Sequence, residues 1–387
     1  MTRSAEVFYL FLRLGLTSFG GPAAHLVYFE QWVVRQKAWM DEQQYRQLVA
    51  LCQFLPGPAS SQVGIGIGLQ HAGFTGALLA FIGFTLPSFL LMTLAGLVGS
   101  QWFSPLAQQG ALCALVVIVG HAVWQMSNSL TPDWPRRCLA GVALLCFLLW
   151  PQPFYQLLIL LVFALFGACW LQPHTVATIT ASPQKTHATT YTTVLLLTLF
   201  ALLLFGLPVV VLQTADALLQ LADACYCAGA MVFGGGHVVL PLLEQNTAGL
   251  ISEADFLSGY ALAQLVPGPL FSFAAYIGAA AGQGVTGALL ATAMLFLPGA
   301  LLVCALWPWW HRLSQYRPLL GAVTAVNCAV VGLLGAAWCQ FIVPHAVSSN
   351  WHLLVIAVAG LVVWRRWCPP IVLLPLLMIA GAMLGWI

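Results

Sequence analysis

Two short segments of this apolar chain place a glycine between two prolines, at Pro56-Gly57-Pro58 and again at Pro267-Gly268-Pro269. A proline at the first position of a helix lacks the amide that would be unpaired there, so the next amides remain free donors. The start of a helix also carries about half a positive charge. This combination favours the binding of an anion without a buried lysine. Side chains nearby that could add neutral hydrogen bonds are Gln53, Ser60, Ser61, Gln264 and Ser272.

Two further breaks with the sequence Phe-Gly-Gly precede these segments. Glycine lets the backbone approach a ligand closely. Four helix starts together could present about two positive charges, enough for a divalent oxyanion. The alternative is structural, because glycine and proline also occur in transmembrane helices as kinks and close-packing points. The residues assigned to these two tips are Gly20, Gly21, Pro22 and His25 in the first, and Gly234, Gly235, Gly236 and His237 in the second.

The composition indicates a membrane protein. Hydrophobic residues make up 61% and charged residues 6% of the 387 residues, which is outside the range of soluble domains. Uncharged runs such as 76–98, 194–212 and 287–307 are long enough for a helix to cross ~30 Å of hydrocarbon. The expected fold class is therefore an all-α polytopic membrane protein.

The chain contains two copies of one unit. The sequence GFTGALLA at 73–80 returns as GVTGALLA at 284–291, 211 residues later, and the Pro-Gly-Pro segments share this offset. The Phe-Gly-Gly segments match with an offset of 214, which also aligns Glu30 with Glu244. The predicted organisation is a first repeat at 1–171, a polar linker at 172–193, an extra connecting transmembrane helix at 194–212 and a second repeat at 213–387.

Equivalent loops of the two copies carry opposite charge, and basic loops mark the cytoplasmic side of a membrane. Arg35, Lys37 and Arg46 follow the first break, whereas the charged residues of the matching loop in the second copy are all acidic. Three further pairs of loops show the same reversal. The copies are therefore expected to insert upside down relative to each other, with a cytoplasmic N-terminus and a periplasmic C-terminus. Such inverted-topology repeats are typical of transporters.

Each half of a broken stretch has about a dozen residues, too few to cross the bilayer alone. Irregular backbone at membrane depth is tolerated only where protein buries it or where it lines a cavity. We therefore expect re-entrant helical hairpins whose tips meet near the membrane midplane, with discontinuous spanning helices as the alternative. Glu30 and Glu244 are expected to end their hairpins near water.

Few ionisable residues lie inside the predicted membrane segments, and each has two interpretations. Arg13 is either a counter-charge for the substrate or a partner of an acidic neighbour such as Asp223. His25 and His237 either couple proton and anion movement or remain neutral and hydrogen-bonded. The other histidines form no ligand cluster, so neither a metal site nor a cofactor is expected.

In combination, these motifs resemble the long, two-domain form of the chromate ion transporter family. The shared features are the two-copy layout, Phe-Gly-Gly followed by histidine in each copy, and the two Pro-Gly-Pro tips, over nearly the whole chain. The resemblance implies a secondary transporter that exports chromate across the bacterial inner membrane and confers chromate resistance. Sulfate, also a tetrahedral dianion, is the expected competitor. The first tip ends in proline and the second in glycine, so the two tips need not contribute equally.

Other function classes fit less well. A membrane-embedded enzyme would need convergent catalytic groups, and no HExxH, paired-aspartate or Ser/His/Asp arrangement stands out, so no enzymatic activity is expected. The alternative function is a transporter or channel for sulfate or another oxyanion. A channel would use similar tips, and only flux kinetics separate it from a carrier. The expected partners are chromate, sulfate, the lipid bilayer and protons as a coupling ion. No nucleic-acid partner is expected, and the oligomeric state stays open, a homodimer included.

Overall fold

A computed structural model of the chain describes residues 2–19, 21–99, 105–171, 190–214, 216–233 and 239–384. Within these residues, five apolar helical stretches are long enough to cross a membrane. They are Ala59–Val98, Leu106–Leu130, Thr190–Val211, Leu270–Trp309 and Arg317–Ala346. The prediction of an all-α polytopic membrane protein is confirmed. Residues 172–189 of the predicted linker lie outside the described residues. So do five of the predicted site residues: Gly20, Gly234, Gly235, Gly236 and His237.

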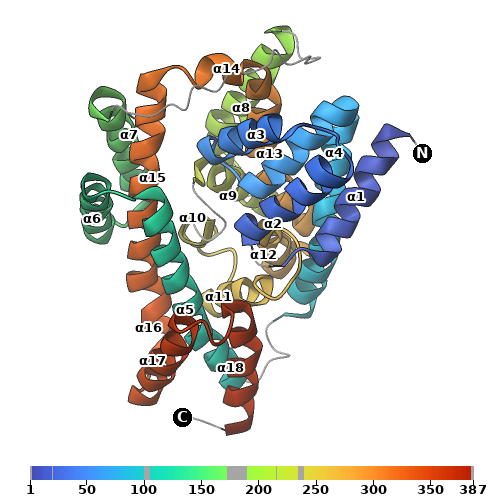
Figure 1. Ribbon diagram of the computed structural model, residues 1–387. Coiled ribbons are helices and arrows are strands. Elements are labelled where there is room, and N and C mark those ends of the chain that lie inside the picture. The colour runs from blue at the N-terminus through green and yellow to red at the C-terminus, as the bar shows by residue number, and fades with distance from the viewer. Residues whose placement is uncertain are drawn as a thin grey trace.

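The helices follow the same order in both copies (Figure 1). The first copy and the connection contain α1 Arg3–Thr17, α2 Gly21–Phe29, α3 Glu42–Phe54, α4 Ala59–Val98, α5 Pro105–Leu130, α6 Trp134–Leu149, α7 Pro153–Trp170 and α8 Thr190–Val211. The second contains α9 Ala217–Met231, α10 Val239–Asn246, α11 Glu253–Ala263, α12 Phe273–Gly278, α13 Gly284–Leu306, α14 Trp310–Leu313, α15 Arg317–Ala337, α16 Val343–Ala346, α17 Asn350–Trp364 and α18 Pro370–Leu384. Short π-helical or 3-10 turns lie at Glu30–Gln36, Leu270–Ser272, Ala279–Gln283, Trp307–Trp309 and Trp338–Ile342.

The connecting helix α8 begins earlier than predicted. Its first turn, from Thr190, was expected to belong to the polar linker because threonine is frequent there. In the structure, the Thr193 hydroxyl donates a hydrogen bond to the Ala305 carbonyl (3.3 Å) and accepts one from Trp309 Nε1 (3.0 Å). These bonds satisfy the hydroxyl against α13 and the turn after it, so the helix extends through the threonines.

The chain folds back at the predicted breaks. Around the first Phe-Gly-Gly break, Phe11 of α1 and Phe29 of α2 bring their rings to 5.4 Å. Around the first Pro-Gly-Pro break, Gly66 lies directly against the Leu48 side chain, and Gly259 lies against the Tyr276 ring around the second. Each pair is nearly equidistant in sequence from its break. The arrangement is that of helical hairpins, as expected, rather than of discontinuous spanning helices.

A second reversal follows each Pro-Gly-Pro hairpin. The helical stretch α4 turns back at Ala72 and Gly73, whose backbone angles are not helical. Gly68 and Gly76 therefore touch backbone to backbone, although a straight helix would hold residues eight apart about 12 Å from each other. Gly278 and Gly287 make the equivalent contact between α12 and α13. The glycine of each GALLA sequence is thus a close-packing point.

Equivalent long helices run in opposite directions (Figure 1). Helix α5 begins beside α18 at the lower end and rises toward α6, whereas α15 begins near α14 at the top and descends toward α16. Each packs against the terminal helix pair of the other copy, because α6 and α7 lie on α15 while α17 and α18 lie on α5. Glycines allow the close crossings, with Gly167 of α7 against Gly321 of α15 and Gly110 of α5 against α18.

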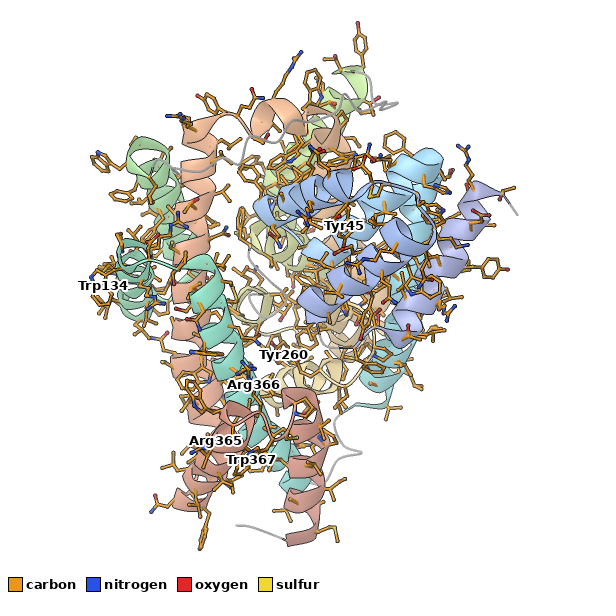
Figure 2. All side chains as sticks on the ribbon, in the orientation of Figure 1. Tyr45, Trp134, Tyr260, Arg365, Arg366 and Trp367 are labelled. Atoms are coloured by element: carbon orange, nitrogen blue, oxygen red, sulfur yellow. The ribbon has the colours of Figure 1, made fainter. Side chains whose placement is uncertain are left out.

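Apolar side chains cover the outside as well as the core. On α8, Leu202 and Phe205 are exposed, and Trp134 projects outward at the start of α6, whereas Tyr260 of α11 is fully buried (Figure 2). A helix that exposes leucine and phenylalanine along its length suits hydrocarbon rather than water. The folded chain therefore has the surface of a multi-pass membrane protein.

Candidate functional site

The four breaks meet in two reciprocal pairs. The Gly268 amide, in the second Pro-Gly-Pro tip, donates a hydrogen bond to the Ser18 carbonyl at the first Phe-Gly-Gly break (3.0 Å). The Gly57 amide donates to the Val232 carbonyl at the other pair of breaks (2.7 Å). These residues are equivalent by the offsets of 211 and 214. Each copy therefore holds a tip of the other, which places the tips at the interface between the copies.

Glycine is required by the backbone at both Pro-Gly-Pro tips. Gly57 has φ of 124° and Gly268 has φ of 99°, values that residues with a Cβ rarely adopt. Pro58 and Pro269 were predicted at the first helical position. In the structure each is the N-cap residue, so the helix begins one residue later. The second tip continues into a 3-10 turn in which the Ser272 amide donates to the Pro269 carbonyl (3.0 Å). The expectation that the Ser272 amide stays free is therefore wrong.

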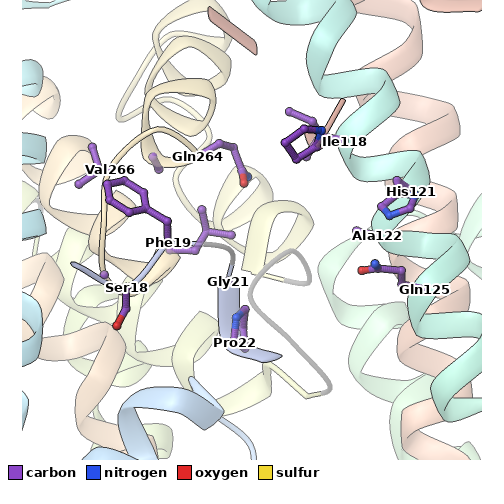
Figure 3. A pocket seen from close by; sticks show the side chains of 14 residues that line it. Ser18, Phe19, Gly21, Pro22, Ile118, His121, Ala122, Gln125, Gln264 and Val266 are labelled. Atoms are coloured by element: carbon purple, nitrogen blue, oxygen red, sulfur yellow. The ribbon is translucent and has the colours of Figure 1, made fainter. Parts of the chain in front are cut away.

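A cavity of about 250 Å³ opens at the pair formed by Ser18 and Gly268. Its walls come from the first Phe-Gly-Gly break, the second Pro-Gly-Pro tip with the end of α11, and the middle of α5. Figure 3 shows His121 and Gln125 of α5 facing Gln264 and Ser18 across Gly21 and Pro22. The lining residues are Ser18, Phe19, Gly21, Pro22, Ile118, His121, Ala122, Gln125, Ala263, Gln264, Val266, Gly268, Leu270 and Pro369.

The cavity offers neutral hydrogen-bond donors. None of its lining residues is Asp, Glu, Lys or Arg. Ser18 is 1% exposed and its hydroxyl has no partner among the described residues, and the same holds for the buried Nε2 of Gln264. An unpaired buried donor costs about 1–3 kcal/mol, which a ligand that accepts hydrogen bonds would relieve. Helix α2 begins at Gly21, so its positive end also faces this space.

Some of the predicted site residues line this cavity, and the others do not. Gly21, Pro22, Gln264 and Gly268 line the cavity. The others flank the tips without lining it: Pro56, Gly57, Pro58, Ser60, Ser61, Pro267, Pro269 and Ser272 are at least half-buried, whereas Gln53 is exposed.

Arg13 lies away from the cavity. Its side chain is on the exposed face of α1, and the guanidinium stacks over the Trp32 ring at 4.4 Å. It does not line the cavity, and the Asp223 carboxylate accepts a hydrogen bond from Cys227 Sγ (3.4 Å) instead of pairing with Arg13. The cation–π contact is what a charged residue gains at such an exposed position.

His25 is buried at the first hairpin. It is 1% exposed, its ring packs edge-on against Phe84 at 5.3 Å, and its ring nitrogens lack a hydrogen-bond partner among the described residues. With the offset of 214, its equivalent in the second copy is not His237 but Val239, which is fully buried. The two histidines that follow the Phe-Gly-Gly segments therefore do not occupy equivalent places.

Sequence reasoning missed the α5 wall and one buried amide. Ser18, His121 and Gln125 line the cavity, and none of them belongs to a sequence motif. Gln62 is fully buried in α4, where it donates to the Pro56 carbonyl (2.9 Å) and the Gly299 carbonyl (3.3 Å). The sequence contained one indication of this role: Gln62 is polar, whereas the equivalent residue of the second copy is Phe273.

Comparison with known proteins decides the family. The chromate transporter family model matches the chain twice, over residues 5–170 and 219–386. The chain belongs to the chromate transporter family. A chromate transport protein of Pseudomonas aeruginosa is 27% identical, covering 99% of this chain and 92% of the relative.

Two further relatives extend the comparison. A chromate transport protein of Cupriavidus metallidurans is 26% identical over 84% of this chain and 80% of its own length. An uncharacterised transporter of Methanocaldococcus jannaschii is 26% identical over 94% of this chain and 90% of its own length. No solved structure matches the chain. The membership of this transporter family, together with the apolar helices, supports chromate transport by a multi-pass membrane protein.

Proposed function

We propose that the protein is a secondary transporter that exports chromate from the cytoplasm across a bacterial inner membrane. The observation that carries this proposal is the cavity between the tips of the two copies, which presents Ser18, Gln264 and the start of α2 and whose described lining residues include no Asp, Glu, Lys or Arg. A dianion would be repelled by a carboxylate there and held too firmly by a lysine. Neutral donors and a helix start allow both binding and release.

The substrate class follows from the same donors. Chromate and sulfate are tetrahedral dianions whose oxygens accept hydrogen bonds in all directions. A cavity of about 250 Å³ has room for such an ion and several waters, each occupying about 30 Å³ in the liquid. We therefore infer that sulfate competes with chromate at this site, and that export of chromate confers resistance.

Chromate counterflow in proteoliposomes tests this proposal. Vesicles loaded with unlabelled chromate should accumulate external labelled chromate transiently, which a carrier shows and a channel does not. The double variant Ser18→Ala and Gln264→Leu should lose at least tenfold in rate at equal amounts of folded protein, because both donors face the ion. Gln53→Leu, on the exposed surface, is the matched control. Normal counterflow in the double variant would contradict the site.

The orientation rests on the loop charges and needs its own test. We propose that the N-terminus is cytoplasmic, the C-terminus periplasmic, and the two copies inverted in the membrane. Reporter fusions at Lys37 and Arg136 should read cytoplasmic, and fusions at Glu253 and Ser348 periplasmic. The same side for Lys37 and Glu253 would exclude the inverted orientation.

A further inference from the structure

A second cavity, of about 420 Å³, lies outside the proposed chromate site. It is enclosed by α10, the lower half of α15 with its π-helical extension, and the hairpin of α6 and α7. Glu244 is the one ionisable residue among its lining residues. Among the described residues that line the first cavity none is Asp, Glu, Lys or Arg, so the two cavities have different electrostatics.

Two of the four glutamines that line the second cavity strengthen this difference. Gln156 Nε2 donates to the Pro151 carbonyl (3.1 Å), and Gln340 Nε2 donates to the Leu148 carbonyl (2.9 Å). Both amide nitrogens are therefore engaged by backbone, and the amide oxygens remain as acceptors. A carboxylate beside acceptor oxygens repels an oxyanion and favours a cation or a proton.

Glu244 has no counter-charge of its own. Its carboxylate makes no hydrogen bond or ion pair within the described part of the chain, although it is only partly exposed. The equivalent residue of the first copy, Glu30, pairs with Arg35 at 3.1 Å. The same carboxylate is thus neutralised in one copy and left available in the other.

Two further charged groups, His345 and Glu253, influence Glu244. His345 Nε2 of α16 and Glu253 Oε2 of α11 lie 2.8 Å apart, and both side chains are partly exposed to solvent. These are the two charged groups that act on Glu244, whereas α15 and the α6–α7 hairpin contribute only amide and apolar side chains to the cavity. Glu244 lies outside the five candidate membrane spans. Burial, and next the charge of Glu253, raise its pKa, and the charge of His345 opposes this effect.

We propose that Glu244 binds the proton whose inward movement is coupled to chromate export, with the Glu253–His345 pair as its connection to water. The inference rests on the proposed transport of chromate. Protonation removes the cost of burying the carboxylate, so the proton favours conformations in which Glu244 is more enclosed. Helix α10 follows the break that holds Gly57 through Val232, which gives this change a direct connection to the paired tips.

The experiment uses purified full-length protein in proteoliposomes with valinomycin and equal potassium on both sides, so that the membrane potential stays at zero. Acid is imposed on the side that carries Glu253. For the wild type, one unit of pH difference should accelerate chromate transport up to about tenfold, because it shifts each proton equilibrium tenfold. A pH-sensitive dye should report proton movement opposite to chromate.

Glu244→Gln should abolish both the acceleration and the chromate-dependent proton movement. Its chromate counterflow at equal pH should remain, which shows that the variant is folded and separates this inference from the proposed function. Glu30→Gln is the matched control and should behave as the wild type. Glu244→Asp should keep the coupling with a shifted pH profile, which a structural role of Glu244 would not produce.

Three outcomes would overturn the inference. In the first, the pH acceleration is unchanged in Glu244→Gln. In the second, acceleration is lost in His25→Asn and kept in Glu244→Gln, which assigns coupling to the first hairpin. In the third, a sodium gradient without a pH gradient drives wild-type transport and a pH gradient does not. Loss of counterflow in the wild type itself would instead refute the proposed chromate carrier.

Discussion

The two Pro-Gly-Pro tips share a sequence and a backbone conformation but have different surroundings. At the first tip, the fully buried Gln62 donates hydrogen bonds to the Pro56 and Gly299 carbonyls. At the second, the equivalent residue is Phe273, whose ring packs against Phe256 at 5.0 Å and Tyr260 at 5.6 Å. The first tip is closed by an amide, whereas the second leaves Gly268 facing the cavity. One motif therefore serves as a fixed support in one copy and as part of the proposed binding site in the other.

The largest difference between the tips should come from a negative charge placed at equivalent positions. Leu270 lines the cavity, and Ala59, 211 residues earlier, does not. Two like unit charges 4 Å apart cost about 4 kcal/mol near a protein surface, roughly 1,000-fold in rate. Leu270→Asp should therefore reduce chromate counterflow by about 1,000-fold, and Ala59→Asp by less than about tenfold. The neutral variants Leu270→Asn and Ala59→Asn control for size, and equal losses at both tips would refute the asymmetry.

A methyl group on each tip glycine should separate support from binding. A Cβ on Gly57 would lie 2.9 Å from the Gly299 Cα, which cannot move aside, whereas the nearest atom to a Cβ on Gly268 is the Ser88 hydroxyl at 3.2 Å. Gly57→Ala should thus lose most of its folded protein. Gly268→Ala should remain folded, with strain of about 1–2 kcal/mol, and lose several-fold in flux per folded molecule.

The GALLA glycines are the controls for these variants. Gly76→Ala and Gly287→Ala meet backbone carbonyls and should lower abundance with normal flux per folded molecule. Chromate flux normalised to monodisperse protein in detergent measures all four variants. Normal flux per folded molecule in Gly268→Ala would remove the second tip from the site.

The Gln62 amide should matter for stability and little for transport. Gln62→Leu leaves the Pro56 and Gly299 carbonyls without their partner, at a cost of about 1–3 kcal/mol. The melting temperature should fall by a few degrees, while flux per folded molecule stays within about twofold of the wild type. Thermal unfolding in detergent measures the first effect, with the exposed Gln53→Leu as control. A large loss of flux at unchanged melting temperature would assign substrate contact to the first tip.

The smallest expected effect concerns the pH dependence of stability. The pKa of Glu244 is raised above its ordinary value of 4.5 in the folded protein. The contribution of Glu244 to the free energy of unfolding is therefore fully present below pH 4.5 and is lost as pH rises through the raised pKa. Glu244→Gln should match the wild type near pH 4.5 and melt higher at pH 8. Glu30→Gln should melt slightly lower at pH 8, because an exposed pair such as Glu30–Arg35 contributes at most about 1 kcal/mol. If the melting temperatures of Glu244→Gln and the wild type differed by the same amount at every pH, this assignment would be contradicted.

The sequence was informative where structure depends on local chemistry and on repetition. Pro56-Gly57-Pro58 and its copy had to break their helices, and the repeat offsets correctly paired Gly57 with Gly268 and Gly76 with Gly287. The hairpins at these breaks were also predictable, because their halves are too short to span a bilayer.

The contacts between copies could not be predicted in this way. Ser18 meets Gly268, and His121 of α5 lines the same cavity, only through the packing of helices far apart in the chain. The surroundings of Arg13 could not be predicted either, because a basic residue in an apolar run says nothing about which face of the helix it occupies. Its Trp32 partner sits across the hairpin, on the segment that returns after the break.

The exchange of terminal helix pairs between the copies has a consequence for biosynthesis. Gly167 of α7 packs against Gly321 of α15, and Gly321 is synthesised about 150 residues later. Helix α7 therefore has no packing partner at Gly167 until then. At 5–20 residues per second, the first half must wait in the membrane for roughly 10–30 s with a helix-packing face turned toward lipid. If the chain were divided between α7 and α8, each half would need the other present in the same membrane to complete its fold.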